Sequence, residues 1–143
     1  MRVKQLKSED FKYAREIFSE CFSKKGYSLS DFGFSWRVRC RDSLGFYTRE
    51  GDMVGFCLVQ RVIGSSNRYI SYFAVREEWR NKGGGVKMLA EMKRKSDENR
   101  FSVYLYSLRS EKLRSWYLKN GFSRSSKGYF NYHFYDTRSK KLN

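Results

Sequence analysis

The sequence feature that most limits how this chain can fold is the run Arg80-Asn81-Lys82-Gly83-Gly84-Gly85. It follows a segment rich in β-branched and aromatic residues, Arg68 to Val75, and precedes apolar residues at helical spacing from Gly84 to about Lys95. The run predicts a strand, a glycine turn and a helix in succession. Glycine lets backbone N–H groups approach a ligand, and a helix N-terminus presents unpaired donors with a partial positive charge. Pyrophosphate is the ligand that this turn favours; a flexible glycine loop is the plain alternative.

The rest of the chain predicts further helices and strands around this unit. The expected elements are a helix over Ser8 to Phe22 with Ser8 as its N-cap, a short helix around Asp31 to Arg39, a hairpin of Leu44 to Thr48 and Val54 to Ile63, a strand over Ser102 to Leu108, a helix over Ser110 to Asn120 ended by Gly121, and a last hairpin of Phe122 to Ser125 with Tyr129 to Tyr135. This order predicts a mixed α/β (α+β) sheet with helices packed on it, in a single domain over residues 1–143.

The charge of the chain points to an anionic ligand or partner. Thirty Lys and Arg residues stand against fifteen Asp and Glu, a formal net charge of +15, and 40% of the residues are hydrophobic. From Asn99 onward, the sequence contains ten basic residues and only two acidic residues, Glu111 and Asp136. Nucleic acid, an anionic membrane and a phosphorylated cofactor are each attracted by such a surface, which can also serve solubility alone.

The cysteines indicate neither a disulfide framework nor a metal site. Cys21, Cys40 and Cys57 are odd in number and far apart, and they have no CxxC spacing or histidine-rich company. We therefore expect free thiols, largely buried, and no bound metal. No apolar run reaches the length of a signal segment or a membrane span, and with the free thiols this predicts a cytoplasmic protein.

Two motifs resemble those of the GNAT superfamily of N-acetyltransferases. Arg80, Gly83 and Gly85 fill the three defined positions of the family's motif A, [Q/R]-x-x-G-x-[G/A]. About thirty residues later, Tyr117-Leu118-Lys119-Asn120-Gly121-Phe122 is similar to the ending of motif B, Y-x-K-x-G-F. The resemblance covers nearly the whole chain. It implies a mostly antiparallel central sheet flanked by about four helices, with a splayed parallel strand pair at the cofactor site.

The resemblance also implies a role for individual residues. An N-acetyltransferase of this family moves an acetyl group from acetyl-CoA directly to an amine. Tyr117 would be the general acid that protonates the departing CoA thiolate, a thiol of pKa about 8.5 beside a phenol of pKa about 10. The residues expected to bind acetyl-CoA are Phe73, Ala74 and Val75 on the pantetheine arm, Arg80, Asn81, Lys82, Gly83, Gly84, Gly85 and Val86 on the pyrophosphate, and Ser110 where the family usually has Asn.

Some positions depart from the family pattern. Glu77 replaces a common proline and Asn81 a common glycine, which predicts a less tightly wound turn. The strand from Arg68 to Val75 contains no Asp or Glu to serve as general base, so water, Asp31 or Glu50 would have to accept the proton of the amine. His133 could also be a base, although a paired or half-exposed strand histidine is the simpler interpretation.

The sequence is compatible with more than one class of acceptor. The positive charge favours a polyanionic carrier, such as a tRNA- or ribosome-associated amine, and Tyr27, Phe32, Phe34 and Trp36 could stack on bases or form core. The alternative function is a basic nucleic-acid-binding module on a catalytically degenerate GNAT scaffold. A longer acyl-CoA is a third possibility. The chain is expected to be a monomer or a homodimer.

Overall fold

The computed structural model describes residues 1–107, 110–126 and 128–132. Among these residues, seven strands form one sheet in the order β1-β2-β3-β4-β5-β7-β6. The strands are β1 (Arg2–Gln5), β2 (Leu44–Tyr47), β3 (Met53–Arg61), β4 (Arg68–Val75), β5 (Val103–Tyr106), β6 (Ser123–Ser126) and β7 (Tyr129–Tyr132). The α-helices are α1 (Phe11–Phe22), α2 (Leu29–Arg37), α3 (Gly84–Asn99) and α4 (Glu111–Lys119), and short 3-10 helices span η1 (Ser8–Asp10), η2 (Ser23–Lys25) and η3 (Glu77–Trp79).

The sheet is mixed and mostly antiparallel. β1 pairs with β2, β2 with β3, β5 with β7 and β6 with β7, all antiparallel. β4 and β5 form the parallel pair, with Arg68 opposite Val103 and Tyr69 opposite Tyr104. A parallel pair needs a long crossover, which α3 supplies. The predicted α/β fold class with a parallel strand pair is therefore confirmed.

Backbone contacts group the chain into two compact units. The first contains Met1–Gln60 and Ser71–Met88, and the second contains Arg61–Ile70 and Leu89–Asn143. β4 and α3 each contribute residues to both units. None of the described helices is long and apolar enough to cross a membrane.

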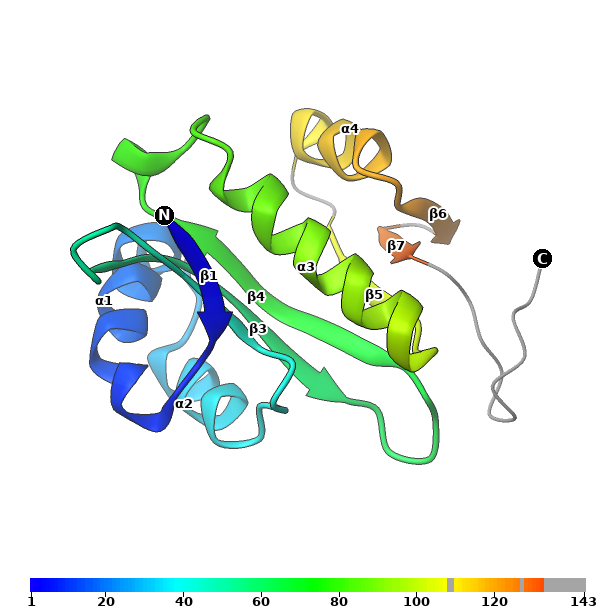
Figure 1. Ribbon diagram of the computed structural model, residues 1–143, viewed down its shortest axis with the longest axis horizontal. Helices are drawn as coiled ribbons and strands as arrows, with labels where there is room; N and C mark the ends of the chain where they lie inside the picture. The colour runs from blue at the N-terminus through cyan, green and yellow to red at the C-terminus, as the bar shows by residue number, and fades with distance from the viewer. Residues whose placement is uncertain (108–109, 127, 133–143) are drawn as a thin grey trace. The chain divides into compact units, whose positions relative to one another are not determined.

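In the first unit, α1 and α2 lie against the strands (Figure 1). One core rich in aromatic side chains joins these helices to the strands. α1 places Ala14, Ile17 and Phe18 at helical spacing, which puts these buried side chains on one face of the helix. The rings of Phe18 and Phe32 stack with centroids 4.5 Å apart, joining α1 to α2. The buried members of this core are Leu6, Ala14, Ile17, Phe18, Cys21, Phe32, Trp36, Tyr47, Met53, Phe56, Leu58 and Ala74.

In the second unit, α4 packs on one face of the strands. Val103, Leu105 and Phe130 are 3% exposed or less, and the ring of Tyr117 on α4 lies 5.9 Å from that of Phe130. The Lys93 ammonium of α3 donates to the backbone carbonyl of Asn120 at 2.7 Å, which joins α3 to the C-terminal end of α4.

Several expected boundaries are wrong by a few residues. Ser8 does not cap α1 but begins η1, and the Asp10 carboxylate accepts the backbone N–H of Lys7 at 2.9 Å. α2 begins at Leu29, where the Ser28 hydroxyl accepts the N–H of Asp31 and caps the helix. β5 ends at Tyr106, and Leu108 lies outside the described residues, as do residues 133–135 of the expected last strand.

The sequence patterns missed one strand entirely. β1 is mostly polar, has exposed side chains, and pairs with β2 from Arg2↔Tyr47 to Gln5↔Leu44. Its position at the edge of the sheet explains why its sequence carries no apolar alternation.

Candidate cofactor and catalytic site

The predicted glycine turn lies between β4 and α3, in the first unit. Backbone hydrogen bonds from Trp79 to Arg76 and from Arg80 to Glu77 close η3, so the chain reverses directly after β4. Asn81 then has φ 62° and Gly83 has φ 84°, both in the left-handed region. Asparagine is among the few residues with a side chain that adopt this conformation readily. Asn81 therefore has the backbone conformation that a glycine would have here. Its replacement of the common glycine gives no reason to expect a less tightly wound turn.

The N-terminus of α3 presents the donors that an anion would use. α3 begins at Gly84, and its first helical hydrogen bond runs from the N–H of Lys87 to the carbonyl of Gly83 at 2.9 Å. The helix itself therefore supplies no acceptor for the N–H groups of Gly84, Gly85 and Val86. These donors, with the positive end of the helix dipole, form an arrangement suited to phosphate oxygens.

The glycines of the turn serve different structural purposes. A Cβ on Gly83 would meet nothing within 4 Å, so its positive φ is the reason for glycine there. A Cβ on Gly84 would lie 2.5 Å from the Phe46 ring of β2. Gly84 is therefore required by the close approach of the helix to the sheet, a reason that the sequence alone did not reveal.

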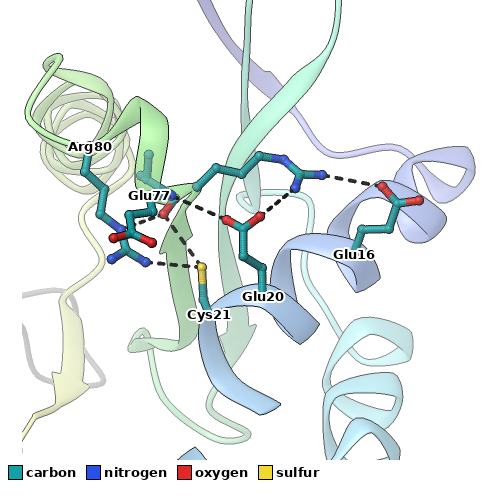
Figure 2. A network of polar contacts seen from close by, with 7 residues as sticks. Glu16, Glu20, Cys21, Glu77 and Arg80 are labelled. Carbon is teal, nitrogen blue, oxygen red and sulfur yellow. Dashed lines mark hydrogen bonds and ion pairs between the residues drawn. The ribbon is translucent and has the colours of Figure 1, made fainter. Parts of the chain in front are cut away.

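The side chain of Arg80 folds back onto the end of β4 (Figure 2). Its Nε donates to the carbonyl oxygen of Val75 at 2.9 Å, and its Nη2 lies 3.4 Å from the sulfur of Cys21. The Cys21 thiol also points at the Val75 carbonyl, 3.7 Å away. Burial raises the pKa of Cys21, against the opposing effect of the Arg80 guanidinium, so this sulfur is a neutral thiol at physiological pH.

A cluster of charges beside Arg80 ties the turn to α1. Arg76 donates to Glu20 at 3.0 Å and to Glu16 at 3.4 Å, and the backbone N–H of Glu77 donates to the second oxygen of Glu20 at 3.4 Å (Figure 2). Glu16 and Glu20 of α1 therefore hold the segment that directly follows β4. Lys82 lies over the Trp79 ring, with its Nζ 5.2 Å from the centroid. Arg80 and Lys82 are both exposed, so their charges can reach a ligand at the turn.

The expected pantetheine strand is the end of β4. Phe73 and Val75 are half-buried and Ala74 is 5% exposed. The carbonyl of Ala74 lies 2.9 Å from the place of a Cβ on Gly55, so glycine in β3 permits the two strands to approach here. The Val75 carbonyl, one of the groups expected to bind pantetheine, is already an acceptor for Arg80.

Tyr117 and Ser110 lie on α4, in the second unit. Tyr117 is 5% exposed, and its ring contacts those of Trp116 at 5.1 Å and Phe122 at 5.8 Å. Such burial among rings also fits a core aromatic, and the general-acid role stays a prediction. Ser110 is the N-cap of α4, where its hydroxyl accepts the N–H of Leu113 at 3.2 Å. Gly121, with φ 91°, ends the helix as the sequence predicted.

The two candidate carboxylate bases, Asp31 and Glu50, are both exposed residues of the first unit. Asp31 lies in the first turn of α2, and Glu50 lies in the β2–β3 turn. The structure adds Tyr72, a half-buried residue of β4 that the sequence analysis missed. Burial raises the pKa of Tyr72, and the negative charge of Asp31 adds to this effect. The negative charge of Asp31 therefore influences the hydroxyl of Tyr72 on β4, the strand expected to bind the cofactor.

The remaining candidate residues are divided between core and surface. Of the four aromatics considered for stacking, Phe32 and Trp36 are core residues, whereas Tyr27 and Phe34 are 37% and 57% exposed. All three cysteines are free, with Cys21 and Cys57 buried and Cys40 half-buried. Within the part of the chain that the structure describes, no cluster of His, Cys, Asp and Glu could hold a metal ion. His133 lies outside the described residues.

This sheet, with its parallel strand pair and the crossover helix that opens at a glycine turn, defines an acetyltransferase fold. A family model described as "Acetyltransferase (GNAT) domain" matches residues 41–124, more than half of the chain. The protein belongs to the GNAT acetyltransferase family. No curated protein matches the sequence.

Solved structures share the fold at low sequence identity. The ribosomal-protein-S18-alanine N-acetyltransferase from Escherichia coli has a TM-score of 0.74 and 15% identity, over 91% of this chain and 90% of that chain. A GNAT-family acetyltransferase from Staphylococcus aureus Mu50 has a TM-score of 0.76 and 12% identity, over 91% and 96%. The PaiA N-acetyltransferase from Thermoplasma acidophilum, in complex with coenzyme A, has a TM-score of 0.69 and 19% identity, over 91% and 95%.

Proposed function

We propose that this protein is an N-acetyltransferase that transfers the acetyl group of acetyl-CoA directly to an amine, within a single domain over residues 1–143. The observation that carries the proposal is the N-terminus of α3, where the N–H groups of Gly84, Gly85 and Val86 have no acceptor within the helix. Family membership and the coenzyme A complex of the PaiA enzyme support the same cosubstrate.

The turn is proposed to bind the pyrophosphate of acetyl-CoA. Backbone donors from Gly83 to Val86 would face the phosphate oxygens, and the Arg80 guanidinium and Lys82 ammonium would add charge-assisted hydrogen bonds. Arg80 would have to leave the Val75 carbonyl, which then becomes available to the pantetheine amides. A single side chain would thus couple pyrophosphate binding to pantetheine binding.

The proposed chemistry moves one acetyl group and two protons. The neutral amine nitrogen attacks the thioester carbonyl carbon, so a C–N bond forms and the C–S bond breaks. The amine gives up one proton to a base, for which Asp31 or water is proposed, and the thiolate takes one proton from the hydroxyl of Tyr117. Ser110 is proposed to contact the cofactor in addition to capping α4.

The net charge of the chain favours one class of acceptor amine. The Escherichia coli neighbour is named for an alanine of a ribosomal protein, and such an acceptor would suit the net charge of +15, because ribosomal partners are surrounded by polyanionic RNA. A ribosome- or tRNA-associated amine is therefore the acceptor class to test first. The cytoplasm is the compartment that matches such an acceptor.

Calorimetric titration with acetyl-CoA is the first test of the proposed function. Saturable binding supports it, whereas lack of binding by the folded protein would contradict it and leave the nucleic-acid-binding module or a longer acyl-CoA as the alternatives. The second test follows the release of CoA thiol with acceptor peptides that begin with alanine. Tyr117→Phe keeps the ring among its aromatic neighbours and should lower kcat by roughly 100-fold while the Kd for acetyl-CoA changes less than about twofold.

Tyr13→Phe is the matched control for that substitution, because Tyr13 is 44% exposed on α1. Equal turnover in Tyr117→Phe and in the unchanged protein would remove Tyr117 from the mechanism. Comparison of acetyl-CoA with longer acyl-CoA thioesters in the same assay determines the acyl group that the enzyme prefers.

A further inference from the structure

Four tyrosines of the second unit lie on one face of its sheet. Tyr69 of β4 lies directly opposite Tyr104 of β5, and Tyr106 of β5 lies directly opposite Tyr129 of β7. Tyr104 and Tyr106 are two residues apart, so their side chains point to the same side of the strand. The ring centroids are 5.0 Å apart for Tyr69 and Tyr104, 6.3 Å for Tyr104 and Tyr129, and 4.9 Å for Tyr106 and Tyr129. These four residues, Tyr69, Tyr104, Tyr106 and Tyr129, form a continuous tyrosine face.

Solvent reaches this face, whereas the opposite face is packed. Tyr106 is 47% exposed and Tyr129 is 38% exposed, while Tyr69 and Tyr104 are half-buried. On the other side of the same strands, Val103, Leu105 and Phe130 are buried, and α4 covers Phe130 through Tyr117. Aromatic rings that are accessible in a contiguous row on a sheet offer stacking surfaces for flat ligands.

The tyrosine face carries no carboxylate. The strand positions that share it with the four tyrosines include Asn131, which lies opposite Tyr104, and Ser123 of β6, which lies opposite Asn131. Burial raises the pKa of Tyr104, with a further contribution from Tyr129, so Tyr104 stays neutral at physiological pH. An anionic chain therefore meets no negative side chain on these positions.

The charge of the second unit is strongly positive. Its residues, Arg61–Ile70 and Leu89–Asn143, include fifteen Lys and Arg against five Asp and Glu, a formal net charge of +10 from 15 − 5. Among the described residues, the acidic side chains of this unit lie on α3 and α4 only. Arg94 pairs with Glu91 and Glu98, and Arg114 pairs with Glu111. Asp97 accepts the hydroxyl of Tyr132, whereas Asp136 lies outside the described residues.

We infer that the tyrosine face binds single-stranded nucleic acid, with bases stacked on the exposed rings of Tyr106 and Tyr129 and the phosphates attracted by the positive charge of the unit. Stacking on aromatic rings tolerates any base, because every base has a π face, and a net positive charge provides affinity through counterion release. A duplex hides its base faces and would lose the stacking contribution. An acidic peptide would be attracted by the charge, but its Asp and Glu side chains have no aromatic ring to stack on a row of four tyrosines.

This inference does not depend on acetyl transfer. It uses residues of β4, β5 and β7 that the proposed function does not assign to acetyl-CoA. Acetyl-CoA binding and nucleic-acid binding are measured separately, so the failure of one leaves the other in place.

Fluorescence anisotropy with a labelled oligouridylate of about 12 nucleotides is the direct test. The unchanged protein should bind it, and the affinity should fall between about 50 mM and 200 mM salt. The double variant Tyr106→Ala with Tyr129→Ala should raise the Kd by roughly tenfold or more, with the same salt dependence, because rings and not charges are removed. Phenylalanine at both positions should restore the affinity, since the stacking surface returns.

Tyr13→Ala on α1 is the matched control, being 44% exposed in the first unit, and it should leave the Kd unchanged. Lack of binding at low salt would overturn the inference. So would an equal Kd for the double alanine variant, an equal loss in Tyr13→Ala, or failure of the phenylalanine variant to bind. Equal binding of a duplex, or competition by polyglutamate at matched charge, would show charge attraction alone and would overturn it as well. If circular dichroism shows that the double variant is unfolded, the Kd values of Tyr106→Ala alone and of the double phenylalanine variant test the inference instead.

Discussion

Arg80 and Val75 are joined by a hydrogen bond of 2.9 Å from the guanidinium Nε to the last carbonyl of β4. The side chain that motif A assigns to the pyrophosphate thus contacts the strand assigned to pantetheine. Cys21 lies beside both groups, with its sulfur 3.4 Å from Arg80 and 3.7 Å from the Val75 carbonyl. Arg80 is therefore placed to exchange a backbone acceptor for a phosphate oxygen, and its loss should affect the cofactor more than the fold.

Arg80→Ala is expected to weaken acetyl-CoA binding by roughly tenfold. A hydrogen bond between charged partners contributes about 1.5–3 kcal/mol, and 1.4 kcal/mol corresponds to a tenfold change in Kd. Arg80→Lys keeps the charge but loses the planar guanidinium. Its Kd for acetyl-CoA should lie between those of the unchanged protein and Arg80→Ala. Calorimetric titration measures the Kd, with Arg49→Ala as the control, since Arg49 is an exposed arginine of the β2–β3 turn. An unchanged Kd in Arg80→Ala would show that the guanidinium does not contact the pyrophosphate.

Gly84→Ala is expected to destabilise the protein by about 1–3 kcal/mol, because the new Cβ would lie 2.5 Å from the Phe46 ring and overpack the core. Urea unfolding measures the difference. Gly33→Ala in α2 is the matched control, since a Cβ there meets nothing within 4 Å, and it should be neutral or stabilising. Phe46→Leu should relieve part of the cost of Gly84→Ala, so the two effects should not add. Additive free energies would disprove the close contact.

The sequence was sufficient where a local pattern determines the structure. The bounds of β4, Arg68 to Val75, were predicted correctly, since a segment rich in β-branched and aromatic residues lies there between two turns. Ser110 and Gly121 likewise delimit α4 through local capping and a positive φ. The edge strand β1 was missed because its polar residues become a strand only through pairing with β2, about forty residues away.

The candidate site was predicted only in part, for the same physical reason. The glycine turn and its helix are local, and both were predicted. The contact of Gly84 with Phe46 and the approach of Asp31 to Tyr72 depend on how distant segments pack, and no spacing in the sequence encodes them. The role of Arg80 as a donor to Val75 depends on a rotamer, which a motif does not specify.

Asn81→Gly is expected to change the free energy of unfolding by less than about 0.5 kcal/mol, because both residues accept a φ of 62°. Asn81→Val should cost about 1–3 kcal/mol, since a β-branched side chain is strained in the left-handed region. Thermal unfolding of the three proteins compares these values. Lys82→Val, next in the chain and without a positive φ, is the control for the effect of valine at an exposed turn. Equal stability of Asn81→Val and Asn81→Gly would contradict the left-handed conformation.

Tyr47→Phe tests a polar contact between β2 and η1 through its dependence on pH. The Tyr47 hydroxyl donates to the Asp10 carboxylate at 2.8 Å, and the ring is 7% exposed. Loss of this hydrogen bond should lower the free energy of unfolding by about 1–2 kcal/mol at pH 7. Burial, followed by the hydrogen bond to Asp10, raises the pKa of Tyr47 above the value of about 10 that it has when unfolded.

The sign of the pH effect follows from which state loses the proton first. Above pH 10 the unfolded chain releases the Tyr47 proton while the folded protein retains it, so the contribution of Tyr47 is complete below pH 10 and decreases as the pH rises further. The stability difference between the unchanged protein and Tyr47→Phe should therefore narrow above pH 10, as urea unfolding at pH 7 and at about pH 10.5 can measure. Tyr13→Phe, an exposed tyrosine of α1, should leave the stability at pH 7 unchanged. A difference that stays constant across this range would show that the pKa of Tyr47 is the same in the folded and unfolded states, which would contradict a pKa raised by burial and by the hydrogen bond to Asp10.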